Sequence, residues 1–140
     1  MSRSTRAPAD VPAIFSAFLV SHLVGDFLLQ TEWQALGKHG GNGAVRYHYR
    51  ALASHIAIYT ASFAPVLAWL AAAGLGTSLP LVALAIALPH ALVDDGRLLA
   101  FWMRHVKHTE PSPGTLLIAV DQRAHVVMLF LTAIVAGTLV

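Results

Sequence analysis

The longest uncharged stretch of the chain constrains its fold more than any other feature. No Asp, Glu, Lys or Arg occurs in the 43 positions from Ala51 to Val93. A soluble fold of this size does not need such a stretch, whereas two membrane crossings of about 20 residues each do. The 140-residue chain is 56% hydrophobic and only 11% charged, while ordinary soluble domains carry about 25% charged residues. The sequence therefore predicts an integral membrane protein.

Four apolar segments divide the chain, and each is close to the length that crosses about 30 Å of hydrocarbon as a helix. They cover about residues 11–30, 51–73, 79–102 and 115–140. Backbone polar groups must be satisfied within lipid, and strand alternation is absent, so helices are the expected spanning form. We predict one all-α domain over residues 1–140, a four-transmembrane-helix antiparallel bundle. Small bundles often pair, which leaves a homo-oligomer as an open alternative.

Basic residues gather in two of the three predicted loops. The loop over residues 31–50 and the loop that follows Trp102 hold five Lys and Arg together, whereas the N-terminal tail holds two and the middle loop none. The positive-inside rule then places both loops in the cytoplasm and both termini outside. Anionic membrane lipid is the expected partner of this modest basic excess. Nucleic acid is excluded because the chain has no basic stripe.

The predicted spans carry ionisable side chains that lipid does not tolerate without compensation. A charge at bilayer depth costs on the order of 2.5 to 3.5 kcal/mol. Three of the spans each hold a His and an Asp four residues apart, which places the two side chains on one helix face. The pairs are His22 with Asp26, His90 with Asp94, and Asp121 with His125. His55 adds a fourth imidazole from the remaining span.

These seven side chains are predicted to meet. All of them fall in the half of the bilayer next to the basic loops, so an antiparallel bundle would bring them into one cluster. Imidazole and carboxylate groups suit a divalent ion such as zinc, manganese or iron. The six paired residues are the predicted metal ligands, and the predicted catalytic groups are Asp26, His55 and Asp94. The alternative is a hydrogen-bonded network that only holds the helices together.

Four further residues are candidates to support the cluster: Gln30, Gln122, Tyr59 and Arg97. The two amides could orient metal ligands. Tyr59 lies one turn beyond the single histidine of the second span. Arg97 follows the acid of the third span, where it could neutralise that acid or extend to lipid headgroups.

Three motifs carry a resemblance to a known family. They are His22-Leu-Val-Gly-Asp-Phe-Leu-Leu-Gln30, His90-Ala-Leu-Val-Asp94 and Asp121-Gln-Arg-Ala-His125, with Lys38 and His55 between them. This pattern resembles an uncharacterised family of small bacterial membrane proteins, which implies a multi-pass protein of the bacterial inner membrane. A looser likeness to bacterial membrane-bound metal-dependent hydrolases implies hydrolytic chemistry. Members of the family often carry a lysine after the acid of the third span, where this chain has Gly96-Arg97.

The sequence thus favours a metal-dependent hydrolase that acts on a membrane-associated, lipid-like substrate. A transporter or channel for metal ions or protons is the first alternative, because the same cluster could bind an ionic substrate in transit. A structural membrane subunit with a polar packing network is the second. The short loops leave little room to recognise a large soluble substrate, which favours lipid or ion over protein.

Overall fold

Helices make up the folded parts of the computed structural model, which describes residues 10–39, 48–111 and 114–139. No strand occurs among these residues, so the predicted all-α class is confirmed. The elements in chain order are α1 (Val11–Leu23), the π-helical η1 (Val24–Leu28), α2 (Glu32–Gly37), α3 (Tyr49–Ser62), α4 (Ala64–Leu70), η2 (Ala71–Leu75), η3 (Gly76–Ser78), α5 (Leu79–Asp94), α6 (Arg97–His105) and α7 (Thr115–Leu139).

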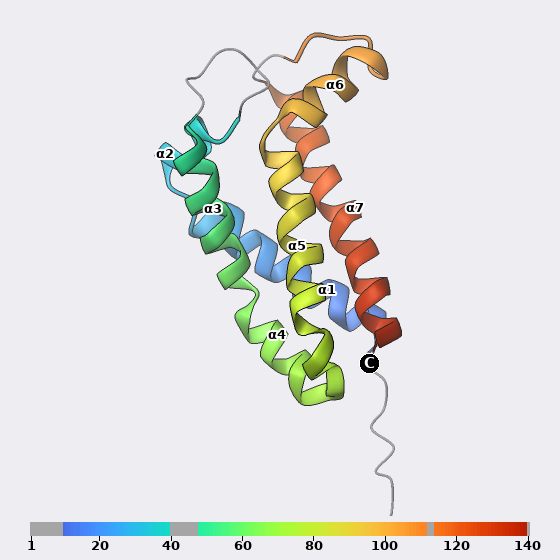
Figure 1. The fold of residues 1–140 in the computed structure, drawn as a ribbon. Coiled ribbons are helices and arrows are strands. Elements are labelled where there is room, and N and C mark those ends of the chain that lie inside the picture. The colour runs from blue at the N-terminus through green and yellow to red at the C-terminus, as the bar shows by residue number, and fades with distance from the viewer. Residues whose placement is uncertain (1–9, 40–47, 112–113, 140) are drawn as a thin grey trace, which may run out of the picture.

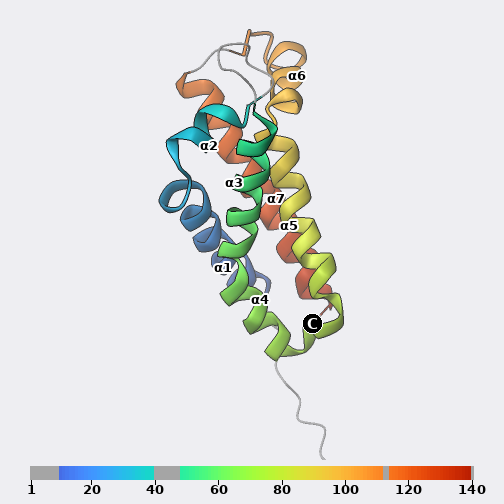
Figure 2. The same cartoon turned by 60° about the vertical axis from the view of Figure 1, so that its left-hand side comes forward.

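The longer helices pack into one bundle (Figures 1 and 2). α7 packs against α1 on one side and α5 on the other, α3 packs against α5 and η1, and α4 closes the ring against α1. Apolar side chains fill the interior of this ring: Ile14, Phe18, Tyr59, Phe63, Leu70, Leu75, Val82, Ile86, Leu129, Ala133 and Ala136. These buried apolar side chains stabilise the part of the bundle that lies away from α2 and α6.

Three helical stretches within the described residues are long and apolar enough to cross a membrane: Val11–Leu28, Ala64–Asp94 and Leu116–Leu139. Length and composition thus support a membrane protein but distinguish three such stretches, where the sequence predicted four. The number of stretches differs because, in the middle of the chain, the helices begin and end at other residues than predicted.

The predicted span over residues 51–73 is interrupted. α3 ends at Ser62 and α4 begins at Ala64, directly before Pro65, which has no backbone N–H to donate. η2 then contains Gly74 with a φ of 121°, in the left-handed region that glycine enters without steric cost. The chain reverses direction in this region, between α4 and α5 (Figure 1).

The next predicted span, over residues 79–102, also divides. α5 ends at Asp94 rather than at Trp102, and Gly96 adopts a φ of 77° before α6 begins. A left-handed residue cannot continue an α-helix, so α6 takes a new direction. The break leaves Asp94 in the last turn of α5, at the end of the bundle that carries α2 and α6.

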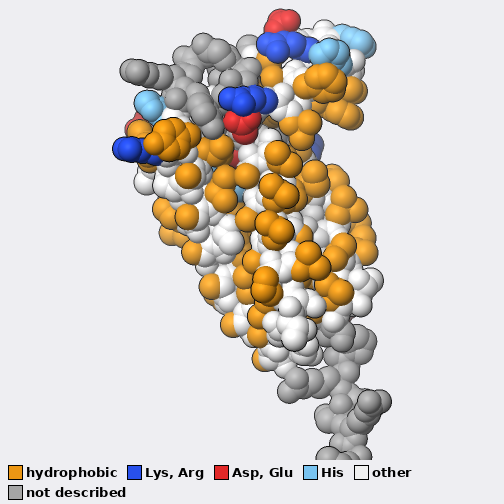
Figure 3. Space-filling model, viewed as in Figure 1, with side chains coloured by type: hydrophobic (Ala, Val, Ile, Leu, Met, Phe, Trp, Pro, Cys, Tyr) orange, Lys and Arg blue, Asp and Glu red, His pale blue; other side chains and the backbone are white. Residues whose placement is uncertain are grey.

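Large apolar side chains cover the outside of the bundle. Val20, Phe27, Leu84, Ile118 and Val127 are each 56–62% exposed. On the face drawn in Figure 3, the described Lys, Arg, Asp and Glu side chains lie near the end with α2 and α6, and apolar side chains extend over the rest. An apolar surface of this extent is unfavourable in water and suited to hydrocarbon.

Candidate metal centre

Buried polar side chains gather at the end of the bundle next to α2 and α6. They come from α1, η1, α3, α5 and α7, so every long segment of the bundle contributes. Each has an exposed fraction of 8% or less. The set comprises all seven side chains that the sequence predicted to meet: His22, Asp26, His55, His90, Asp94, Asp121 and His125.

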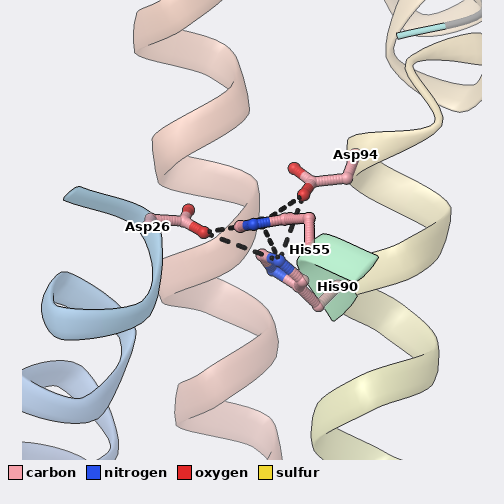
Figure 4. Close-up of side chains that lie close together, drawn as sticks. All are labelled: Asp26, His55, His90 and Asp94. Atoms are coloured by element: carbon pink, nitrogen blue, oxygen red, sulfur yellow. Dashed lines mark hydrogen bonds and ion pairs between the residues drawn. The ribbon is translucent and has the colours of Figure 1, made fainter. Parts of the chain in front are cut away.

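Four of these residues form a tetrad in which one potential ligand atom from each lies within 4.8 Å of the others: Asp26, His55, His90 and Asp94 (Figure 4). His55 Nε2 lies 3.1 Å from Asp26 Oδ1 and 2.9 Å from Asp94 Oδ2. His90 Nε2 lies 3.6 Å and 3.1 Å from the same two oxygens and 3.0 Å from His55 Nε2.

The dimensions of the tetrad fit a tetrahedral cation. Bonds of about 2.0–2.2 Å from a zinc-like ion to nitrogen and oxygen imply ligand atoms about 3.3–3.6 Å apart. The five separations given above range from 2.9 to 3.6 Å. Neither carboxylate oxygen of Asp26 has a hydrogen-bond partner among the described residues. When the Nε2 atoms of His55 and His90 carry lone pairs, the buried Asp26 carboxylate has no donor among these residues, and a cation bound by the tetrad would supply the missing interaction.

A second group shares one member with the tetrad. Asp94, Asp121 and His125 each offer an atom within 4.8 Å of the other two. His125 Nε2 lies 3.5 Å from Asp94 Oδ1. The other carboxylate oxygen, Asp94 Oδ2, is the one that contacts His55 and His90. Asp94 therefore presents one oxygen to each group, and we call the second group the triad.

Gln30 sets the orientation of His55. Its amide nitrogen donates to the Asp26 carbonyl oxygen at 3.1 Å when its amide oxygen accepts from Lys38 Nζ at 2.8 Å. In this orientation the same amide oxygen lies 3.4 Å from His55 Nδ1. A proton on Nδ1 then leaves the Nε2 lone pair directed into the tetrad, as a metal-binding histidine requires. The supporting role of Gln30 stays a prediction.

Lys38 is a charged member of the described site that was named between the sequence motifs but not predicted to belong to the cluster. It is only 5% exposed, and its Nζ donates to Asp94 Oδ2 at 2.9 Å. α2 carries it there after a capping box in which Gln34 N donates to Thr31 Oγ1 and Thr31 N donates to Gln34 Oε1. The Thr-x-x-Gln pattern is visible in the sequence and could have predicted a short helix that turns Lys38 toward the bundle.

His22 lies beside the two groups and belongs to neither. Its Nδ1 lies 3.2 Å from the Tyr59 hydroxyl and its Nε2 lies 3.3 Å from Gln122 Oε1. Both ring nitrogens are thus engaged, with Nε2 donating to the amide oxygen and Nδ1 accepting from the hydroxyl. Gln122 in turn donates to Asp121 Oδ2 at 3.1 Å. The predicted role of His22 as a metal ligand stays a prediction, and its contacts here are those of a positioning residue.

For Arg97 the sequence left two roles open, neutralisation of Asp94 or extension to lipid headgroups. Arg97 Nε lies 3.4 Å from Asp95 Oδ2, and its side chain is 70% exposed. The cation beside Asp94 is Lys38 instead. The left-handed Gly96 accounts for this, because the turn that it makes directs Arg97 onto a separate helix.

The π-helical turn η1 brings Asp26 to the tetrad by a close approach at Gly25. Short π-helical turns often occur at functional sites, because the extra residue redirects side chains. A Cβ added at Gly25 would lie 2.7 Å from Tyr59 Cδ2 and 3.0 Å from Ser62 Oγ. The Tyr59 ring stacks on the His90 ring at 3.4 Å between centroids, so any displacement of Tyr59 reaches the tetrad.

Gly25→Ala should therefore destabilise the protein by about 1–3 kcal/mol, the usual cost of an overpacked core. Thermal unfolding in detergent, followed by circular dichroism, measures this change. Gly76→Ala is the matched control, because a Cβ at Gly76 meets no atom within 4 Å and its φ is −45°. Equal melting temperatures for the two variants would contradict the close approach at Gly25.

Comparison with known proteins places this geometry in a family. Neither the curated proteins nor the solved structures gave a match. The model of one family, described as a protein of unknown function (DUF3307), matches residues 14–140. The match includes all members of the tetrad and the triad, and it agrees with the resemblance to an uncharacterised family that the sequence motifs indicated. The match covers most of the chain, and the chain therefore belongs to the DUF3307 family.

Proposed function

We propose that this protein is a metal-dependent hydrolase of the bacterial inner membrane that acts on a lipid-like substrate. In this proposal the chain crosses the bilayer four times, through α1, the α3–α4 run, α5 and α7. The observation that carries the proposal is the uncompensated negative charge of a cluster built from metal-binding side chains.

The charge balance of the cluster calls for a divalent cation. Three buried carboxylates, those of Asp26, Asp94 and Asp121, face one buried ammonium, that of Lys38. With neutral imidazoles the formal charge is −2. A buried charge of this size is expensive in an apolar setting unless it is paired. One divalent cation would neutralise it with ligands that zinc, manganese and iron all accept.

The chain's own residues have separate roles in this proposal. Asp26, His55, His90 and Asp94 would hold the cation, which supplies Lewis acidity and lowers the pKa of water. Gln30 would hold His55 in the tautomer that directs Nε2 into the tetrad. The apolar packing around the cluster keeps bulk water out and so strengthens the electrostatic interactions inside it.

A small cavity next to the triad supports a lipid-like substrate. Its volume is about 70 Å³, and its walls include Leu99, Pro111, Leu117 and Ile118, whereas Asp121 and His39 supply ionisable groups. Burial, together with the neighbouring Lys38 ammonium, lowers the pKa of His39, so its imidazole is neutral at pH 7. Apolar walls with a polar end suit an amphiphile whose head approaches the cluster.

The packing beyond the cluster favours hydrolysis over transport. Between the cluster and the η2–η3 turn, the described interior holds mainly apolar side chains such as Phe18, Phe63 and Ile86, each 2% exposed or less, and no charged side chain is buried there. Ions in transit need polar groups along their route. The cavity beside Asp121 lies at the opposite end, next to α6.

Metal content and hydrolysis of vesicle lipids together test the proposal. The detergent-purified protein should contain a divalent metal by elemental analysis and should hydrolyse lipids when reconstituted. His90→Ala removes a tetrad ligand and should lose both properties, whereas His105→Ala, at an exposed histidine of α6, should lose neither. Metal retention with ion flux in sealed liposomes and no hydrolysis would favour the transporter instead. Metal-free wild-type protein would refute both.

Orientation in the membrane is open to a separate test. The basic residues of the two loops predict that α6 faces the cytoplasm and the η2–η3 turn faces outside, although Arg3, Arg6 and Arg46 lie outside the described residues. The chain contains no native cysteine, so single cysteines report cleanly. In intact cells an impermeant thiol reagent should label Thr77→Cys and spare Lys107→Cys. The reverse pattern would invert the proposed topology.

A further inference from the structure

The triad meets the requirements of a metal site in its own right. We propose that Asp94, Asp121 and His125 bind a second divalent cation, bridged to the first through the Asp94 carboxylate. The inference rests on the proposed metal centre, and it adds that the second cation is the one that meets the substrate.

Each residue of the triad has one buried polar atom without a hydrogen-bond partner in the described part of the chain. Asp94 Oδ1, Asp121 Oδ1 and His125 Nε2 have no hydrogen-bond partner among the described residues. The side chains of Asp94 and His125 are more than nine-tenths buried, and that of Asp121 is 12% exposed. Buried polar atoms are seldom left unpaired, and an unpaired set that converges on one point indicates a missing ligand. Two carboxylate oxygens and an imidazole nitrogen select a cation as that ligand.

The tautomer of His125 agrees with this assignment. Its Nδ1 lies 3.0 Å from the Asp121 carbonyl oxygen, which can only accept a hydrogen bond. The proton must therefore be on Nδ1, and Nε2 carries the lone pair. That nitrogen lies 3.5 Å from Asp94 Oδ1, a separation expected for two ligands of one ion. A backbone carbonyl that holds the outer nitrogen of a histidine is a common feature of metal sites.

Asp94 is placed to bridge the two cations. Its Oδ2 lies 2.9 Å from His55 Nε2 and 3.1 Å from His90 Nε2, within the tetrad. Its Oδ1 lies toward His125, within the triad. A carboxylate shared in this manner holds two metal ions about 3.5–4 Å apart in known two-metal sites.

The two positions differ in how many ligands the chain supplies. The tetrad provides four, so an ion held there would bind water only in a fifth position. The triad provides three and so leaves coordination open, as catalytic sites do. Asp121 also forms part of the cavity wall beside α6, so the open side of the second position is the one that a substrate reaches.

Charge predicts the order in which the two positions fill. The first cation neutralises the formal charge of −2, so the second binds without that attraction and close to a like charge. Titration of metal-free protein with Mn²⁺ should therefore show two steps, the second weaker than the first. At saturation two Mn²⁺ ions per chain should give the electron paramagnetic resonance spectrum of an exchange-coupled pair. Saturation at one uncoupled ion, or no binding, would overturn the inference.

Variants of the triad separate the second cation from the first. Asp121→Asn and His125→Ala should each retain one uncoupled Mn²⁺ and lose vesicle-lipid hydrolysis, while Asp95→Asn, next to the bridging acid, should keep the coupled pair. A variant that holds one ion and hydrolyses at the wild-type rate would overturn the role of the second cation yet leave the proposed hydrolase intact. A coupled pair in a protein without hydrolysis would sustain the second site and refute the hydrolase. The wild-type spectrum decides the stoichiometry even where a variant does not fold.

Discussion

Asp94→Asn is expected to remove bound metal from both ligand groups and to lower the stability of the protein by about 3–5 kcal/mol. The loss of metal follows because each Asp94 oxygen faces one group, and an amide is a poor ligand in place of a carboxylate. The loss of stability follows because Lys38 stays buried without its counter-ion, and breaking a buried ion pair from one side has about this cost. Elemental analysis and denaturant unfolding in detergent measure the two effects.

A double variant separates the two effects of this substitution. Lys38→Met with Asp94→Asn removes both charges, so stability should return toward that of the metal-free wild type, because apolar replacements of buried ion pairs are often neutral. Metal should remain absent. Asp95→Asn is the control, since its carboxylate pairs with the exposed Arg97 and faces neither group. Full metal content in Asp94→Asn would refute the role of Asp94 as a ligand shared by the two groups.

Lys38→Met alone is expected to tighten metal binding by at least about tenfold, which corresponds to about 1.4 kcal/mol. The Lys38 ammonium lies 2.9 Å from an oxygen that belongs to the tetrad, so it repels a cation held by that oxygen. A single charge and a divalent ion about 5 Å apart repel by several kcal/mol at an effective dielectric constant of 20. After chelation, the variant should also have a lower free energy of unfolding than wild type, because the formal charge of the metal-free cluster becomes −3 instead of −2.

Competition with a metal indicator gives the affinity in this test, and melting with and without chelator gives the stability. Lys107→Met removes an equal charge at an exposed position after α6 and should change neither quantity. Weaker metal binding in Lys38→Met would mean that the main effect of the Lys38 ammonium is to orient the Asp94 carboxylate, and not to repel the metal cation.

The meeting of the polar residues could be predicted because two simple rules determine it. A spacing of four residues places His90 and Asp94 on one helix face, and the same holds for Asp121 and His125. Alternating helix direction then brings the end of one span next to the start of the following one. The tetrad and the triad differ from this prediction only in detail, since His22 engages Tyr59 and Gln122 and remains outside both.

Local backbone geometry accounts for what could not be predicted. Gly74 and Gly96 are ordinary glycines in the sequence, and only the structure shows that their positive φ values end one helical run and redirect another. Lys38 was counted among the loop charges because lysine is rarely buried. Its burial depends on a capping box and on a carboxylate 56 positions further along the chain, and neither amphipathic spacing nor hydropathy relates such distant residues.

The distribution of the cluster over the helices also determines when it can form during biosynthesis. η1 supplies Asp26 early, whereas α7 supplies Asp121 and His125 only after the rest of the described bundle has been synthesised. Before α7 docks, the tetrad and the Lys38–Asp94 ion pair can already form, but Asp94 Oδ1 lacks His125 as a neighbour in a membrane that penalises a bare carboxylate. A chain that stops before α7 thus leaves one side of this polar cluster uncovered within the membrane, a mark of incomplete synthesis that membrane quality control can recognise.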